Sequence, residues 1–182
     1  MNNNQITVDN IAGYCFESTL WRILCDITSN REFNITPTHY PLIRSNNLLI
    51  CNESFEIASQ TQLCSESDAI WHIGALISYL SSGHPIFGGK GKEFHDKHPS
   101  IQLPSLRKEH SALTPIVHSC LNANESQRIS FAELKKQALI GYNDCIKREK
   151  IRIELPQKQS TTSISHNEMW SEAMVPPTSN NI

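Results

Sequence analysis

Histidine is the side chain in this sequence with the widest choice of chemistry, because it can hold a metal ion or move a proton near neutral pH. The chain has eight histidines, and its best candidates for metal ligands are His95, Asp96, His98 and His110. A zinc site needs three or four such ligands at defined spacings. The cysteines lie far from this segment and no ligand pair repeats its spacing. We therefore interpret these histidines as surface or partly buried side chains and expect no metal.

A neighbouring cysteine and histidine form the second arrangement that suggests chemistry. Cys120 follows His118 closely, and a thiol activated by an imidazole is a nucleophile in many enzymes. Positions this close on one helix do not face each other, however. Cys120 also belongs to the apolar face of a predicted helix. We expect no catalytic residue here.

A glycine-rich stretch, residues 88–92, is the third candidate, as a loop that holds phosphate groups. It reads Gly-Gly-Lys-Gly-Lys. It lacks the spacing of a phosphate-binding loop and the serine or threonine that follows the lysine in such a loop. We interpret it as a turn, and we expect no cofactor.

Composition narrows the class of protein. The 182 residues are 38% hydrophobic and 19% charged, with a formal net charge of −2, and a nucleic-acid-binding domain would normally show a basic excess. We see no signal peptide and no apolar run of about 18 residues that would span a membrane. The six cysteines show no Cys-x-x-Cys spacing. We therefore expect a cytoplasmic protein with free thiols that binds neither nucleic acid nor membrane.

The elements that must position any site begin with a helix at about residues 67–81. Its apolar residues surround the whole helix, so it is predicted to be buried on all sides. Before it, the apolar residues from Leu20 to Ile27 predict a helix. Asn30–Pro41 is predicted to be a loop, and residues 47–58 are predicted to form a small hairpin. Residues 59–66 are polar, and residues 82–106 are predicted to be mainly loop, with a short helix near 90–97.

The second half is predicted to be helical and to end in a tail. Apolar residues from Leu113 to Leu121 follow helical spacing, a capping box at residues 130–133 opens another helix, and residues 142–151 form a further one. The predicted fold is mainly α (α+β) with a small β-hairpin. Its parts are a flexible N-terminus at 1–14, one domain at 15–155 and a mostly disordered tail at 156–182.

Two sequence blocks resemble the C-lobe of protein kinases. In residues 67–89, a Trp-His-Ile-Gly run inside the apolar helix is followed by a Gly and a Pro-Ile-Phe. In residues 103–138, a helix ending in Cys-Leu precedes an Arg-Ile-Ser that opens the next helix. The resemblance covers roughly residues 15–140 and implies a kinase C-lobe-like helical domain. Trp71, Gly74 and Arg128 would belong to its structural core.

The resemblance also implies a catalytically dead, pseudokinase-like domain. Fewer than twenty residues, none of them lysine, precede the first helix, so an ATP-binding N-lobe is expected to be absent. If Asn47 matches the family's metal-binding asparagine, Leu42 stands at the catalytic aspartate and Tyr40 and Pro41 stand at the preceding His and Arg. Arg44 would match the loop lysine. Ser-Gln-Thr at residues 59–61 replaces Asp-Phe-Gly, and no Ala-Pro-Glu follows.

Two finer expectations follow from the same alignment. Ala69 stands where the family's central helix begins with aspartate, so we expect Asp68 to cap this helix instead. Arg128 matches an arginine that pairs with the missing Ala-Pro-Glu glutamate. A buried unpaired arginine is costly, and it is therefore expected to pair with Glu66 or Glu53 or to face water.

The function expected from this resemblance is a non-catalytic protein-interaction module, a scaffold or regulator of a partner protein. By analogy alone, that partner is a kinase or a phosphatase. One alternative is the C-lobe half of a split kinase that receives an N-lobe in trans, and another is an unrelated all-helical structural protein. The predicted interface lies where a kinase has its N-lobe and activation segment, unless the loops 30–46 and 59–66 close that face. Its candidate residues are Leu42, Ile43, Leu48, Ile50 and Phe55, with the tail residues Met169 and Trp170 as a cover.

Overall fold

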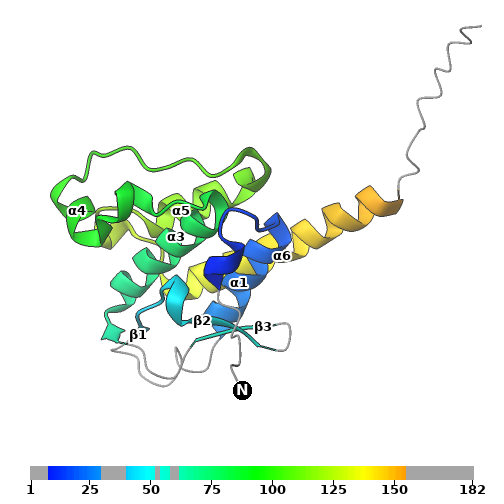
Figure 1. The fold of residues 1–182 in the computed structure, drawn as a ribbon, viewed down its shortest axis with the longest axis horizontal. Helices are drawn as coiled ribbons and strands as arrows, with labels where there is room; N and C mark the ends of the chain where they lie inside the picture. Colours follow the sequence, from blue (N-terminus) through cyan, green and yellow to red (C-terminus); the bar gives the residue numbers. More distant parts are fainter. Residues whose placement is uncertain (1–7, 30–39, 52–53, 58–61, 155–182) are drawn as a thin grey trace, which may run out of the picture.

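The computed structural model describes residues 8–29, 40–51, 54–57 and 62–154, and it is mainly helical with a small antiparallel β component (Figure 1). The α-helices are α1 (Glu17–Ser29), α3 (Glu66–Ser82), α4 (Gly91–Lys97), α5 (Thr114–Cys120) and α6 (Phe131–Glu154). The 3-10 helices are η1 (Val8–Ile11), η2 (Ser45–Asn47), η3 (Ile86–Gly89), η4 (Lys108–Leu113) and η5 (Glu125–Gln127). Strand β1 (Tyr40–Pro41) pairs with β4 (Leu63–Cys64), and β2 (Leu48–Cys51) pairs with β3 (Ser54–Ile57). No helix in these described ranges is long and apolar enough to cross a membrane.

Helix α3 is the buried central helix that its sequence predicts. The Ser65 side chain caps its N-terminus by accepting a hydrogen bond from the backbone N–H of Asp68, and Gly83 ends it in the left-handed conformation at φ 77°. Trp71 is 1% exposed, which confirms the predicted burial. The expected cap at Asp68 is wrong in one respect, because Ser65 is the capping residue and Asp68 stands at the third helical position.

Gly74 lets α5 approach α3 closely. A Cβ atom built on Gly74 would lie 2.7 Å from Cβ of Cys120. That distance is shorter than any normal carbon–carbon contact, so a larger residue would push the two helices apart. The role of Gly74 in the structural core therefore agrees with its predicted position.

Helices α1 and α6 pack side by side, and α6 is longer than expected. The backbone N–H of Glu133 donates to Oγ of Ser130 at 3.3 Å, as the predicted cap requires. The sequence predicts two helices from residue 130 to 151, whereas one continuous helix runs through Gly141 to Glu154. The ring of Trp21 fills the space beside Gly141, so this glycine serves helix packing and does not end the helix. The last turns of α6 extend beyond the other elements (Figure 1).

The segment before α1 is part of the folded domain. Val8 is fully buried, and the backbone N–H of Gly13 donates to the carbonyl of Leu80 at 2.8 Å. Residues 8–14 therefore differ from the flexible N-terminus predicted for 1–14, while residues 1–7 lie outside the described part. The predicted loop at Asn30–Pro41 is described only at its end, where Tyr40 and Pro41 form β1. The predicted tail at 156–182 also lies outside the described residues.

Candidate functional site

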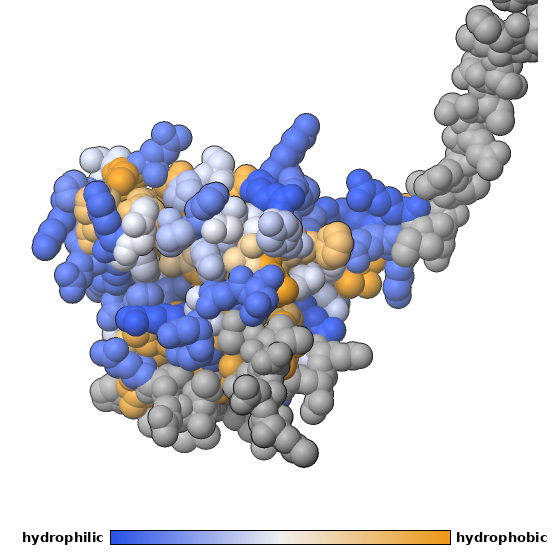
Figure 2. Space-filling view, in the orientation of Figure 1, coloured by the Kyte–Doolittle hydropathy of each residue, from blue (hydrophilic) through white to orange (hydrophobic). Residues whose placement is uncertain are grey.

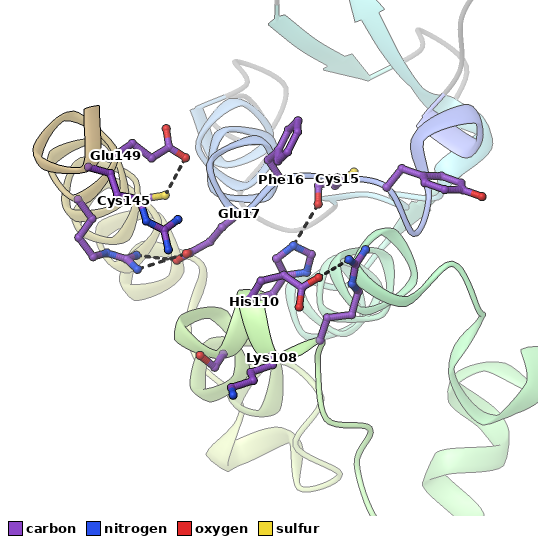
Figure 3. Close-up of a pocket in the computed structure, with 13 residues that line it drawn as sticks. Cys15, Phe16, Glu17, Lys108, His110, Cys145 and Glu149 are labelled. Carbon is purple, nitrogen blue, oxygen red and sulfur yellow. Dashed lines mark hydrogen bonds and ion pairs between the residues drawn. The ribbon is translucent and has the colours of Figure 1, made fainter. Parts of the chain in front are cut away.

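An open cleft of about 600 Å³ lies where the segment before α1, the helix η4 and the second half of α6 meet (Figure 3). We call it the Phe16 cleft. Its lining includes Tyr14, Cys15, Phe16, Glu17, Arg107, Lys108, Glu109, His110, Cys145, Arg148, Glu149 and Arg152.

Two ion pairs organise the walls of the Phe16 cleft. Arg148 on α6 binds the carboxylate of Glu17 on α1 at 2.6 Å. Arg107, which directly precedes η4, pairs with Glu109 in η4. Burial raises the pKa of Glu17, but hydrogen bonds from Arg148 and Trp21 outweigh it and bring the net pKa below its ordinary value. Glu17 is therefore ionised at neutral pH and holds α6 against α1.

Two further cations of the cleft make no ion pair with another described residue. Lys108 and Arg152 are both exposed, and Lys108 extends from η4 away from His110 (Figure 3). Because Arg107 and Arg148 are already paired with glutamates, Lys108 and Arg152 are the charges available to a ligand. Glu149 also lines the cleft without an ion pair among the described residues, so the cleft offers two cations and one carboxylate to an approaching partner.

The two thiols and the imidazole that line the cleft are not arranged for catalysis. Cys15 and Cys145 are both buried, and burial raises the pKa of each thiol to about 11, so little thiolate exists at neutral pH. His110 bonds Oγ of Ser81 through Nδ1 at 2.8 Å and the carbonyl of Cys15 through Nε2 at 3.1 Å. With both ring nitrogens occupied and its pKa lowered by burial, His110 acts as a structural link.

Two aromatic side chains stand almost free beside this cleft. Tyr14 is 84% exposed and Phe16 is 77% exposed. Most of the visible surface in Figure 2 is hydrophilic, with hydrophobic atoms in separate patches. A large aromatic ring left in water is unfavourable unless a partner covers it, and aromatic residues are enriched in protein interfaces. The cleft therefore has the composition of a binding surface.

Asn47, which the proposed resemblance aligns with a kinase catalytic loop, stabilises the turn in which it lies. Oδ1 of Asn47 accepts from the backbone N–H of Arg44 at 2.8 Å, and its Nδ2 donates to the carbonyl of Leu42 at 2.9 Å. Its amide group is thus used within the loop. Residues 59–61, at the position of Asp-Phe-Gly, lie outside the described residues.

Arg128 is buried as expected, but with other partners. Its guanidinium donates to the carbonyl of Ser67 at 2.9 Å and to that of Asn122 at 2.9 and 3.0 Å, and Glu125 lies 3.8 Å away. The prediction that it pairs with Glu66 is wrong, because Glu66 accepts from the hydroxyl of Tyr40 and the backbone N–H of Phe131. Glu53 lies outside the described residues. Two carbonyl oxygens and the more distant carboxylate of Glu125 are thus the partners of this guanidinium.

The metal candidates do not converge. His95 is buried against Trp71, His98 bonds the carbonyl of Phe94 at its own helix end, and His110 bonds Ser81. Across the described ranges, no three histidine, cysteine, aspartate or glutamate side chains come together as metal ligands. Cys120 is buried too, and burial raises the pKa of its thiol to about 12.

The predicted interface residues are mostly inside the domain. Leu42, Ile43, Leu48 and Phe55 are buried, and Ile50 is partly exposed. The prediction of a surface made by all five is wrong. The backbone N–H of Leu42 donates to the carbonyl of Gln62 at 2.7 Å, and that of Phe55 donates to Oδ2 of Asp26 at 3.0 Å. The first bond joins the described ends of the loops 30–46 and 59–66, and the second joins β3 to α1. Residues 30–39 and 59–61 lie outside the described residues, so the alternative that these loops close the face stays a prediction. Met169 and Trp170 lie outside the described residues.

The Phe16 cleft was not found by reasoning from the sequence. Its residues come from three segments, 14–17, 107–111 and 145–152. Within these segments, the two aromatic residues of the run Tyr-Cys-Phe at 14–16 are the signal that the sequence offers. Comparison with known proteins adds no assignment, because no protein-family model and no curated protein matches this chain.

Proposed function

We propose that this chain is a non-catalytic, kinase C-lobe-like domain that works as a protein-interaction module, a scaffold or regulator of a partner protein. The order of its elements supports the resemblance: a first helix, a hairpin, a buried tryptophan helix, loops and two packed helices. By analogy, the partner is itself a kinase or a phosphatase. The absence of a carboxylate at Leu42 and the use of Asn47 within its own loop support a non-catalytic role.

The observation that carries the proposal is the exposure of Tyr14 and Phe16 beside the Phe16 cleft. Protein interfaces draw much of their binding free energy from a few aromatic anchors, each surrounded by contacts that exclude water. Lys108 and Arg152 would add charge at the rim, where it mainly affects the association rate.

The alternatives fit these residues less well. A split kinase needs a catalytic carboxylate in this chain even when an N-lobe is supplied in trans, and Leu42 occupies that position. A Trp71 at the edge of the domain would favour an unrelated all-helical structural protein. Trp71 is instead buried at the centre of the domain.

The test is quantitative capture of partners from the native source with the full chain and with its Tyr14→Ser/Phe16→Ser variant. A matched control, Leu63→Ser, removes another exposed hydrophobic side chain outside the cleft. We expect at least one protein to be captured about tenfold less by the cleft variant and equally by the control, since one anchor contributes more than about 1.4 kcal/mol. Equal capture by all three folded proteins would contradict the proposal.

A further inference from the structure

A second groove, of about 430 Å³, runs along α3 between residues 43–45 and residues 85–91. We call it the Arg44 groove. It shares no lining residue with the Phe16 cleft. Its floor is apolar, because Ala75, Leu76, Pro85 and Ile86 face it. Ala75 is only partly buried, whereas Leu76 is buried. An aliphatic side chain laid over Ala75 would therefore remove apolar surface from water on both sides.

Among the described residues that line this groove, the charged side chain is a cation. Arg44 lines the groove, is exposed, and makes no ion pair with another described residue. Lys92, whose charge also acts on His72, is already held by Asp68 at 3.2 Å and Asp96 at 2.8 Å, and Nζ of Lys90 lies over the Phe94 ring, 4.5 Å from its centroid. Arg44 is thus the charge that remains for a ligand, and a guanidinium matches the geometry of a carboxylate.

His72 provides a neutral polar group beside Arg44. Burial, followed by the nearby charges of Arg44 and Lys92, lowers the pKa of His72 to about 4, although Asp68 acts in the opposite direction. The imidazole is therefore uncharged at neutral pH and available for a hydrogen bond to a ligand. It also reports on the local charge, because an anion bound to Arg44 would raise its pKa.

The rim of the groove is held in an unusual backbone conformation. Phe87 has φ 51°, in the left-handed region that side chains with a Cβ rarely adopt, and it is followed by Gly88 at φ 62° and Gly89 at φ 81°. Such residues are costly and cluster at ligand-binding and switch regions. A Cβ on Gly88 would meet nothing within 4 Å, so the turn is open on its outer side.

We propose that the Arg44 groove binds an extended segment of a partner protein that places an acidic side chain against Arg44 and an aliphatic side chain over Ala75. The volume lies in the range of small-ligand sites and suits two or three residues. We infer the acidic side chain because Arg44 makes no ion pair with another described residue, and the aliphatic side chain because the floor of the groove is apolar. This inference assigns a ligand class to a surface that the function proposed above does not use.

The experiment selects ligands from a positional library of acetylated hexapeptides on the immobilised full chain. The wild type is expected to enrich Asp or Glu at one position next to Leu, Ile, Val or Met. Arg44→Glu should bind the selected peptide more than tenfold more weakly and enrich Lys or Arg at the acidic position instead. Arg44→Lys keeps the charge and should retain the acidic selection with weaker binding.

Two controls separate this groove from the Phe16 cleft and from simple charge attraction. Arg152→Glu makes the same charge change in the other cleft and should leave the selection unchanged, whereas Ala75→Trp fills the Arg44 groove at constant charge and should remove it. In NMR titrations, the selected peptide should raise the pKa of His72 above about 4. The proposal is overturned if no acidic residue is enriched, if Arg44→Glu binds like the wild type, or if the pKa of His72 does not move. Loss of selection in Arg152→Glu alone would also overturn it, since the ligand would then occupy the Phe16 cleft.

Discussion

Nε1 of Trp71 donates a hydrogen bond to Nδ1 of His95 over 3.1 Å, and both side chains are 1% exposed. An indole can only donate, so His95 accepts at Nδ1 and carries its proton on Nε2. Burial lowers the pKa of His95, which favours this neutral form. The bond joins the centre of α3 to α4. It makes His95, a metal candidate in the sequence, a partner of the central tryptophan.

Trp71→Ala should lower the free energy of unfolding by about 3–5 kcal/mol, the range for removing a large core aromatic. Trp71→Phe keeps a ring but leaves Nδ1 of His95 without its donor, at a cost of about 1–3 kcal/mol for the unpaired group. Urea denaturation followed by circular dichroism measures both. An unchanged midpoint for the soluble alanine variant would show that α3 is not the central helix.

We expect no phosphotransfer and no tight binding of ATP. The reason is that, in the proposed kinase-like alignment, Leu42 would stand at the catalytic aspartate, and that Asn47 uses its amide within its own turn. The purified chain is incubated with labelled ATP, Mg²⁺ or Mn²⁺ and a generic protein substrate, and its melting temperature is measured with and without MgATP. Transfer that Asn47→Ala abolishes, or a melting shift of several degrees, would contradict this expectation.

Gly141→Ala should destabilise the domain by about 1–3 kcal/mol, because its Cβ would overlap the Trp21 ring and force α1 and α6 apart. In a helix with nothing packed against it, the same replacement of glycine by alanine would be stabilising, since alanine is the better helix former by about 1 kcal/mol. Asn143→Ala, at an exposed position two residues away, is the matched control and should be neutral or slightly stabilising. A Gly141→Ala protein more stable than the wild type would mean that α1 does not pack here.

Stability should fall as the pH drops from about 6.5 to about 4, partly through His72. The folded pKa of His72 is about 4, below the ordinary 6.5, so the unfolded state binds more protons in this interval. The stability of the folded state that depends on a neutral His72 is fully present above pH 6.5 and is lost as the pH falls through 4. Because His72 is partly exposed, we expect about 1–2 kcal/mol from it after solvent screening. His72→Gln should flatten the pH dependence by that amount in denaturation curves at pH 7 and pH 4. An unchanged slope would exclude this role.

The elements predicted from sequence alone are those whose signals are local. Helix α3 is apolar all round, and such a helix has to be buried whatever surrounds it. The hairpin predicted at residues 47–58 and the capped start of α6 also depend on neighbouring residues in the chain. The kinase-like identity of the domain stays a prediction.

Contacts between distant segments decided the remainder. The sequence predicts two separate helices, the second beginning at residue 142, but the ring of Trp21 packs against Gly141 and a single helix continues. Arg128 donates to the carbonyl oxygens of Ser67 and Asn122 and pairs with Glu125 instead of Glu66, because a buried guanidinium bonds whatever acceptors the fold brings within reach. The Phe16 cleft joins residues more than 90 positions apart. No local pattern encodes such a meeting, since it depends on how the helices pack after each has formed.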